Sequence, residues 1–360
     1  MANFARLLKL INRPLLQAAI VFIIILLIFL ALPHSSYSGA SANASGATRR
    51  DVDAVKNETL GFEKVFFINM PNRPDKRDYI TLASSILQFH PEPVNGVFVD
   101  DIDKKAYPSN WDHGKLPAEM GAWRAHMNVM QRIVQGPDLH RIRPGGRRGL
   151  GCQLEETTST ICIRFAARHC GIQYKTGPIH VTTDDITTVP LPELPRYWHG
   201  FPAGADNGTR LVARMHDGVC SLGYAITYLG AQKLLSALSL TPKGDGAPFD
   251  VAIGRSCQNG WLRCIAPFPS LIGLWKAAGP KARESDIHND DGWIEKETPV
   301  GTVYSAMDNA HRLLNGERTV HAVLNDAPAP EIDPTKLELP EGTLKMLDDT
   351  GINEIIKGNV

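Results

Sequence analysis

The sequence predicts an α/β domain that follows one N-terminal membrane-spanning helix. Two observations lead to this prediction. Residues 15–32 form an uncharged apolar run, and after residue 61 short apolar runs alternate with helical segments that have one apolar side. The 360 residues include 38 basic and 38 acidic side chains, so the chain has no formal net charge. We expect no nucleic-acid partner, because phosphate binding requires a concentrated positive field.

The apolar run LLQAAIVFIIILLIFLAL at 15–32 is long enough to cross a bilayer. With a rise of about 1.5 Å per residue, such a helix spans about 27 Å, close to the thickness of the hydrocarbon layer. Three basic residues precede it, namely Arg6, Lys9 and Arg13. The positive-inside rule therefore leaves the tail 1–14 in the cytosol. We expect a signal-anchor of a single-pass type II membrane protein, with a cleaved signal peptide as the alternative.

Residues 33–60 predict a flexible stem, because they are small, polar and too poor in apolar side chains to fold alone. Sequons for N-glycosylation begin at Asn43, Asn57 and Asn207, all on the predicted lumenal side, which agrees with a glycoprotein. The six cysteines include no C-x-x-C pair, so we expect no zinc site. An oxidising lumen permits disulfides, but the spacing does not give their connectivity.

We expect the globular domain to cover residues 61–325, followed by a polar, peripheral tail at 326–360. Its first strand is expected at Lys64–Asn69 and its second at Gly96–Asp100. A helix from about Asp75 separates them, with an apolar face that consists of Tyr79, Leu82, Ala83, Ile86 and Leu87. This strand–helix–strand order favours a parallel sheet with a right-handed crossover.

A second helix is expected to begin at Pro117, where a proline costs no helical hydrogen bond. Its apolar side contains Met120, Trp123, Met127, Met130 and Val134. Glu119 and His126 are seven positions apart and share one face. Residues Gly223–Leu238 predict a strand that leads into a helix with Ala231, Leu234, Leu235 and Leu238 inward. A further helix begins at Pro248-Phe249-Asp250, and Ile265–Leu271 has the prolines of an edge segment.

Five short motifs, taken in order, resemble those of glycosyltransferase family 25, the lipopolysaccharide and collagen-type galactosyltransferases. They are VFFINMPNRPDKR at 65–77, LPAEMGAWRAH at 116–126, SLGYAITYLGAQKLL at 221–235, PFD at 248–250 and SDI at 285–287. The second motif has Ala118 and Ala125 where the family has glycine and serine. The specificity lies in the ordered set rather than in any one motif.

The resemblance implies a GT-A-like domain with a Rossmann-like mixed sheet, which transfers a sugar from a UDP-sugar donor to a hydroxyl group of a glycan or glycoprotein. It also implies a hexosyltransferase of the Golgi or ER membrane, a divalent metal (usually Mn²⁺), and galactose as the sugar. A departing nucleoside diphosphate carries concentrated negative charge that a metal and basic groups stabilise.

The resemblance and the position of the motifs nominate eight site residues. Asn69, Arg73 and Arg77 follow the first strand, where such sheets bind ligands, and His126 joins them as a contact of the nucleotide sugar. Asp250 and Glu119 are the catalytic candidates, and Asp286 or His288 would complete the metal shell. Each residue also has a purely structural interpretation: a solvated helix start, a carboxylate favoured by a helix N-terminus, or a packed histidine.

The segment 136–168 departs from the family pattern. The family has an apolar strand and an acidic metal motif here, whereas this chain has neither and is basic between Arg141 and Arg148. A reading frame shifted by one nucleotide is compatible with an apolar strand followed by acidic residues, so we interpret this segment as mis-framed. The alternatives are a non-catalytic type II membrane protein that keeps the fold for binding, and the product of a faulty gene model. Two weaker acidic candidates are Asp184–Asp185 and Asp100–Asp103.

Overall fold

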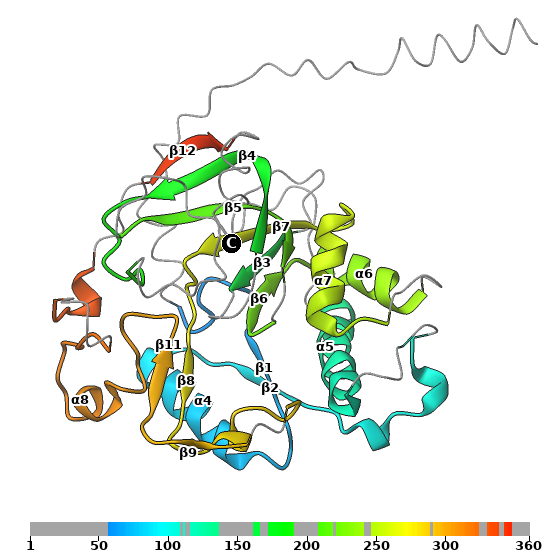
Figure 1. Cartoon of the computed structure of the whole chain (residues 1–360), viewed down its shortest axis with the longest axis horizontal. Coiled ribbons are helices and arrows are strands. Elements are labelled where there is room, and N and C mark those ends of the chain that lie inside the picture. Colours follow the sequence, from blue (N-terminus) through cyan, green and yellow to red (C-terminus); the bar gives the residue numbers. More distant parts are fainter. Residues whose placement is uncertain are drawn as a thin grey trace, which may run out of the picture. The chain divides into compact units, whose positions relative to one another are not determined.

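The computed structural model describes residues 57–108, 111, 116–136, 161–165, 172–190, 208–218, 221–240, 246–288, 291–323, 330–337 and 342–347 (Figure 1). All of them belong to one unit, Ala47–Val360. The predicted anchor at 15–32, the stem before residue 57 and most of the segment 136–168 lie outside the described residues. Within the described part of the chain, no helix combines the length and the apolar character that crossing a bilayer requires.

The described residues form a mixed α/β structure, as the sequence predicts. The largest sheet has six strands in the order β12-β4-β5-β7-β3-β6, and three two-stranded sheets accompany it: β1-β2, β8-β11 and β9-β10. In the large sheet β3 and β7 run parallel, whereas the other neighbouring strands are antiparallel. The expected parallel arrangement is therefore restricted to β1-β2 and to that one pair.

The first strand and the first helix form as predicted, at β1 (Phe66–Asn69) and α4 (Pro74–Leu87). The second strand, however, is β2 (Glu92–Asn95), and the predicted strand at Gly96–Asp100 is wrong. The Gly96 N–H still donates to the Asn69 carbonyl at 2.8 Å, but the chain then turns into the 3₁₀ helix η1 (Val99–Asp101). A proline fits inside β2 because this strand has one neighbour among the described strands.

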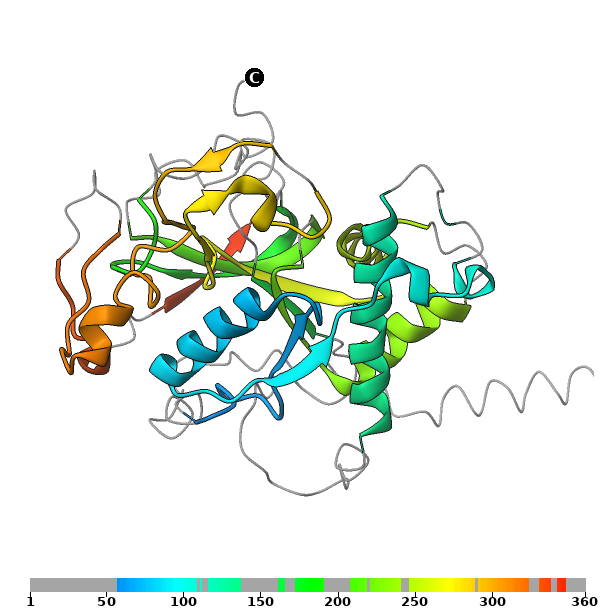
Figure 2. The same ribbon diagram turned by 90° about the horizontal axis from the view of Figure 1, so that it is seen from below.

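Helix α5 (Pro117–Gln135) provides much of the core. Met120, Trp123, Met127 and Met130 are buried, as the helical spacing predicts. Gly121 lies so close to the segment after β2 that a Cβ atom there would sit 2.3 Å from the Val97 carbonyl oxygen. Figures 1 and 2 show β1 and β2 between α4 and α5. Helix α4 differs from α5, because none of the residues on its predicted apolar face is fully buried.

The six-stranded sheet contains three differences from the sequence prediction. Its strands are β3 (Ile161–Phe165), β4 (Ile172–Thr182), β5 (Arg210–Gly218), β6 (Gly223–Ile226), β7 (Arg263–Phe268) and β12 (Gly342–Leu347). Strand β3 lies in the segment that we expected to lack an apolar strand; its alternating Ile, Cys and Phe residues suit a sheet. Strand β12 comes from the expected peripheral tail and pairs with β4.

The third difference concerns β7, which lies between β5 and β3, whereas the sequence predicts an edge segment at Ile265–Leu271; within that range Ile265 pairs on both sides and the strand then pairs with β5 alone. Pro267 is tolerated there because the pairing with β3 ends at Ile265. At Pro267 the pairing continues on one side only, with Val212 of β5. A proline lacks the N–H that a second neighbouring strand would require.

Helix α7 (Phe249–Gln258) packs against β5, where Gly254 allows a backbone approach: a Cβ atom would lie 2.3 Å from the Gly218 carbonyl oxygen. The disulfide Cys257–Cys264 joins the end of α7 to β7. Helix α6 (Tyr228–Leu235) begins after Thr227, whose hydroxyl accepts the Gly230 N–H at 3.1 Å. The remaining elements are η2 (Lys104–Ala106), η5 (Ser236–Leu240), β8 (Leu274–Lys276), β9 (Gly279–Pro280), η6 (Lys281–Arg283), β10 (Trp293–Ile294), β11 (Thr298–Val300), α8 (Ala310–Leu314) and η7 (Pro334–Lys336).

Candidate functional site

Asn69, the last residue of β1, shapes the loop that leads into α4. Its side chain is 8% exposed, and its Nδ2 donates to the carbonyls of Met70 at 2.9 Å and Arg73 at 3.1 Å. These two hydrogen bonds hold the turn that carries Arg73. The structure therefore gives Asn69 a positioning contact in the loop at the carboxyl end of β1, where the sequence predicts a ligand site.

Arg73 connects this loop to a distant part of the chain. Its Nε and Nη2 donate to the two carboxylate oxygens of Asp75 at 2.9 and 2.8 Å. Its Nη1 donates to Asp286, which lies 213 positions further along the sequence. Nη2 also donates to the Arg283 carbonyl at 2.7 Å. Two of the five motifs, at 65–77 and 285–287, thus meet at one guanidinium group.

The charges in this cluster stabilise one another. The hydrogen bonds from Arg73 lower the pKa of the Asp75 carboxyl to about 2, and Asp75 in turn raises the pKa of Arg73. Burial lowers the pKa of the neighbouring Lys76, and the positive charge of Arg73 acts in the same direction. Asp75 is therefore ionised over the whole physiological range, and Arg73 is neutralised from two sides.

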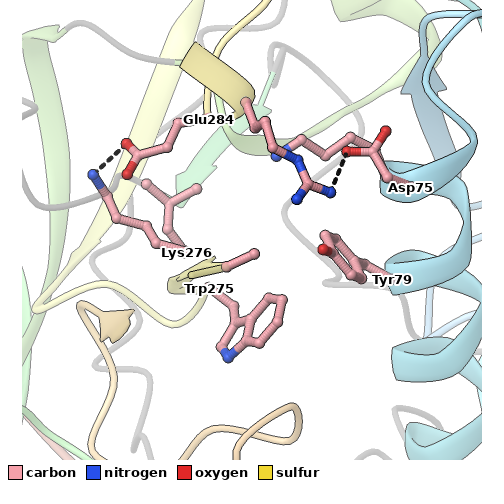
Figure 3. A pocket seen from close by; sticks show the side chains of 9 residues that line it. Asp75, Tyr79, Trp275, Lys276 and Glu284 are labelled. Atoms are coloured by element: carbon pink, nitrogen blue, oxygen red, sulfur yellow. Dashed lines mark hydrogen bonds and ion pairs between the residues drawn. The ribbon is translucent and has the colours of Figure 1, made fainter. Parts of the chain in front are cut away.

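A pocket of about 90 Å³ lies next to this cluster (Figure 3). It is lined by Asp75, Lys76 and Tyr79 of α4, by Leu274, Trp275, Lys276 and Ala277 of β8 and the following residue, and by Arg283 and Glu284. The rings of Tyr79 and Trp275 meet edge to face with their centres 5.0 Å apart. The Lys276 ammonium donates to Glu284 at 2.5 Å on the opposite side from Asp75.

His126 forms a second cluster with residues of two other motifs. Its ring stacks on Phe249, with ring centres 4.1 Å apart and parallel planes. Its Nδ1 lies 3.0 Å from the Tyr224 hydroxyl, and its Nε2 lies 3.3 Å from the Ser221 hydroxyl. Helix α5, strand β6 and helix α7 therefore each contribute a side chain to this cluster.

The surroundings of His126 disfavour its protonated, charged form. Burial against the two aromatic rings lowers the pKa of His126 to about 4, although the nearby Asp250 carboxylate opposes the change. His126 is therefore neutral at pH 7 and offers hydrogen bonds rather than a positive charge. The Oδ1 of Asp250 accepts the Val251 N–H at 2.8 Å, at the start of α7.

The other predicted site residues lie outside these contacts. Arg77 is exposed on α4 and does not line the pocket. Glu119 is half-buried in the first turn of α5, where its backbone N–H donates to Leu116. His288 is exposed, and its backbone N–H donates to the Ser285 hydroxyl at 3.1 Å.

The described residues do not supply a metal site. Among them, no group of three or more His, Cys, Asp or Glu side chains is arranged to hold a metal ion. Asp286 is paired with Arg73, so Asp286 and His288 alone do not fit the predicted metal shell.

The two weaker acidic candidates have other partners. Asp185 forms an ion pair with the buried Arg210 at 2.6 Å and accepts from Thr187. In the second candidate, the Asp103 side chain accepts the Lys105 N–H at 3.1 Å and so caps η2. Both carboxylates hold loops in place.

Sequence reasoning did not nominate the residues that complete the Arg73 cluster and its pocket. Asp75 lies within the motif at 65–77, and Arg283 precedes the SDI motif by two positions, so their place in or near a motif was a usable signal. No sequence signal identified Trp275, Lys276 or Glu284, whose contribution depends on the position of β8 beside α4. Comparisons of the chain with protein-family models, with curated proteins and with solved structures find no match.

Proposed function

We propose that residues 61–325 form a glycosyltransferase domain of the family 25 type, with a GT-A-like fold, that binds a UDP-sugar and transfers the sugar to a hydroxyl group of a glycan or glycoprotein. The observation that carries this proposal is the contact between Arg73 and Asp286. It joins two motifs that were selected from sequence alone and that lie 213 positions apart. The His126 cluster brings together three further motifs in the same way.

Arg73 is the residue that we assign to the diphosphate. Asn69 holds the loop, and the guanidinium group supplies the fork of donors that suits phosphate oxygens. A diphosphate has to compete with Asp286 for this group. Asp286 is the more exposed of the two carboxylates around Arg73, so it is the one that a ligand displaces more easily.

Asp250 is the residue that we assign as the base that takes the proton of the acceptor hydroxyl, with Glu119 as the second candidate. A carboxylate suits this role because it accepts a proton within hydrogen-bond distance of the attacking oxygen. Asp250 lies close enough to His126 to influence its pKa. A neutral His126 with Tyr224 then provides uncharged donors and acceptors for hydroxyl groups.

Binding without catalysis is the second candidate function, and the segment 136–168 is what favours it. This segment is basic where the resemblance implies acidic metal ligands, and the described residues do not replace those ligands. A chain that keeps Arg73 and the His126 cluster still has the means to bind a nucleotide sugar.

We also propose that this domain lies in the lumen of the Golgi or ER behind a type II anchor. The uncharged run at 15–32 supports this membrane topology. The disulfide Cys257–Cys264 supports an oxidising compartment.

The first experiment is a calorimetric titration of the full chain with UDP, with and without Mn²⁺. We expect UDP to bind and the variant Arg73→Met to weaken binding about tenfold, because a charge-assisted hydrogen bond is lost. Arg318→Met is the matched control, since Arg318 is exposed and lies outside the nominated site residues, and it should leave the affinity unchanged. Absence of UDP binding, or equal binding by the two variants, contradicts the proposal.

The second experiment decides between catalysis and binding alone. Sequencing of the transcript across codons 130–175 tests whether the acidic motif is encoded in a shifted frame. If it is, release of UDP from UDP-galactose by the corrected chain should depend on Mn²⁺. If the transcript encodes Arg147-Arg148-Gly149-Leu150 as written, we expect UDP binding without sugar transfer.

A further inference from the structure

Two hydrogen-bond donors of helix α4 that line the pocket have no hydrogen-bond partner among the described residues. The Lys76 ammonium is half-buried and forms neither a hydrogen bond nor an ion pair there. The Tyr79 hydroxyl has no hydrogen bond either, although its ring contacts Trp275. These two residues are three positions apart on α4 and therefore lie on one face of the helix. Partly buried donors without a hydrogen bond are unfavourable unless water or a ligand accepts a hydrogen bond from them.

Three cationic side chains line the pocket, and Lys76 is the one that forms no ion pair with a carboxylate of the described residues. Lys276 is held by Glu284 at 2.5 Å, and Arg283 lies 3.9 Å from Asp75. Asp75 is itself bound through both oxygens by Arg73. Burial lowers the pKa of Lys76 and the charge of Arg73 acts in the same direction, whereas the carboxylates of Asp75, Asp286 and Glu284 act against them. An anion beside the ammonium group would add to this opposing effect.

The pocket has room for a compact group, because its volume of about 90 Å³ exceeds the roughly 10–15 Å³ that one water molecule needs on the same measure. The first turn of α4 adds a favourable field for negative charge. In Figure 3 the Tyr79 hydroxyl points into the space between Asp75 and the Lys276–Glu284 pair. The buried indole N–H of Trp275 also has no hydrogen-bond partner among the described residues, and in Figure 3 it points away from Asp75.

We propose that this pocket is a subsite for one compact oxyanion, a carboxylate or phosphate group of a small ligand, which the Lys76 ammonium and the Tyr79 hydroxyl bind together. The subsite goes beyond the proposed nucleotide-sugar site, because it assigns a second negatively charged group beside Arg73. It holds whether or not the chain transfers a sugar.

The test is a calorimetric titration of the full chain with inorganic phosphate and, separately, with glucuronate; glucose serves as the uncharged comparison. We expect at least one of the two anions to bind and glucose not to bind. Lys76→Met should weaken anion binding about tenfold or more, and Tyr79→Phe, which removes one oxygen atom, about threefold. Lys64→Met is the matched control, because the exposed Lys64 is already paired with Glu92 at 3.0 Å. The anion that binds with the higher affinity shows whether the pocket prefers a phosphate or a carboxylate group.

Failure of both anions to bind overturns the subsite, and so does a Lys76→Met variant that binds with wild-type affinity. If Lys76→Met lacks the circular dichroism spectrum of the wild type, unchanged affinity in Tyr79→Phe overturns the proposal instead. The UDP titration keeps the two proposals separate. Anion binding that depends on Lys76 in a chain that does not bind UDP supports the subsite and contradicts the nucleotide-sugar function.

Discussion

Arg73 and His126 are both titratable side chains that the fold brings to partners distant in sequence. The surroundings of Arg73 favour its charged form, whereas those of His126 favour its neutral form. Arg73 is surrounded by the carboxylates of Asp75 and Asp286, which stabilise its positive charge. His126 is stacked on Phe249 and hydrogen-bonded to the Tyr224 hydroxyl, and burial lowers its pKa to about 4. One cluster is a partly exposed network of ion pairs, and the other is an aromatic cluster in which the histidine is neutral at pH 7.

The difference indicates which chemistry each cluster suits. Ion pairs at a partly exposed site exchange easily with an anionic ligand, because the carboxylates and the ligand compete for the same donors. An aromatic cluster with a neutral imidazole offers a fixed surface with uncharged hydrogen bonds, which suits hydroxyl groups. The same comparison predicts how the two clusters affect the free energy of unfolding. We expect a large contribution from the His126 cluster and a small one from the Arg73 cluster, since partly exposed ion pairs contribute little to stability.

The largest expected effect is on the aromatic cluster. Phe249 is 3% exposed, and Phe249→Ala should lower the free energy of unfolding by about 3–5 kcal/mol, because it opens a cavity and removes the surface on which His126 stacks. Urea denaturation of the full chain measures this change. Phe98→Ala is the control, since Phe98 is 39% exposed, and should cost about 1 kcal/mol or less. Equal losses in both variants contradict a structural role of the cluster.

The next effect is the dependence of stability on pH. The pKa of His126 is about 4 in the folded chain and about 6.5 when unfolded, so between these values only the unfolded chain binds the proton. The stability that this group contributes should therefore be fully present above about pH 6.5 and fall by about 3 kcal/mol as the pH drops towards 4. His126→Gln should flatten this part of the profile of unfolding free energy against pH. His311→Gln, on the exposed surface of α8, should leave it unchanged; equal profiles for all three chains contradict the assignment.

The smallest effect is expected at Arg73. Arg73→Met should lower the free energy of unfolding by about 1 kcal/mol at pH 7, since it removes ion pairs that are partly exposed. The pKa of Asp75 is lowered to about 2, so the stability that this carboxylate contributes is present above about pH 4 and is lost as the pH falls towards 2. In Arg73→Met the pKa of Asp75, measured by NMR, should rise towards its ordinary value. If the pKa of Asp75 is the same in Arg73→Met as in the control variant Arg77→Met, then Arg73 does not cause the low pKa of Asp75.

Helices were predicted more accurately from the sequence than strands and contacts. The spacing of Met120, Trp123, Met127 and Met130 correctly identified the buried side of α5, because a repeat of 3.6 residues is a local property. The second strand was predicted too late, at Gly96–Asp100, since a short apolar run does not distinguish a strand from a 3₁₀ turn. The prolines of Ile265–Leu271 agree with the one-sided pairing at Pro267, but they did not indicate that β7 also pairs with β3 at Arg263–Ile265.

The candidate site was predicted in part. Asn69, Arg73, His126, Asp250 and Asp286 were identified from motifs, and each has contacts in one of the two clusters. Arg77 and His288 were named for the same reason and are exposed. Sequence patterns show which residues follow a strand or begin a helix, but they do not show which side chains face a common point.

The sequence by itself determined the mixed α/β class, the helices at α4, α5, α6 and α7, and the order of the five motifs, because these depend on local periodicity and on residue type. The tertiary structure alone decided that Arg73 meets Asp286 across 213 positions, that Phe249 stacks on His126, and that β8 lies beside α4 to form the pocket. These contacts depend on how the elements pack, and packing balances burial of apolar surface against pairing of charge over the whole domain. No local pattern in the sequence contains that balance.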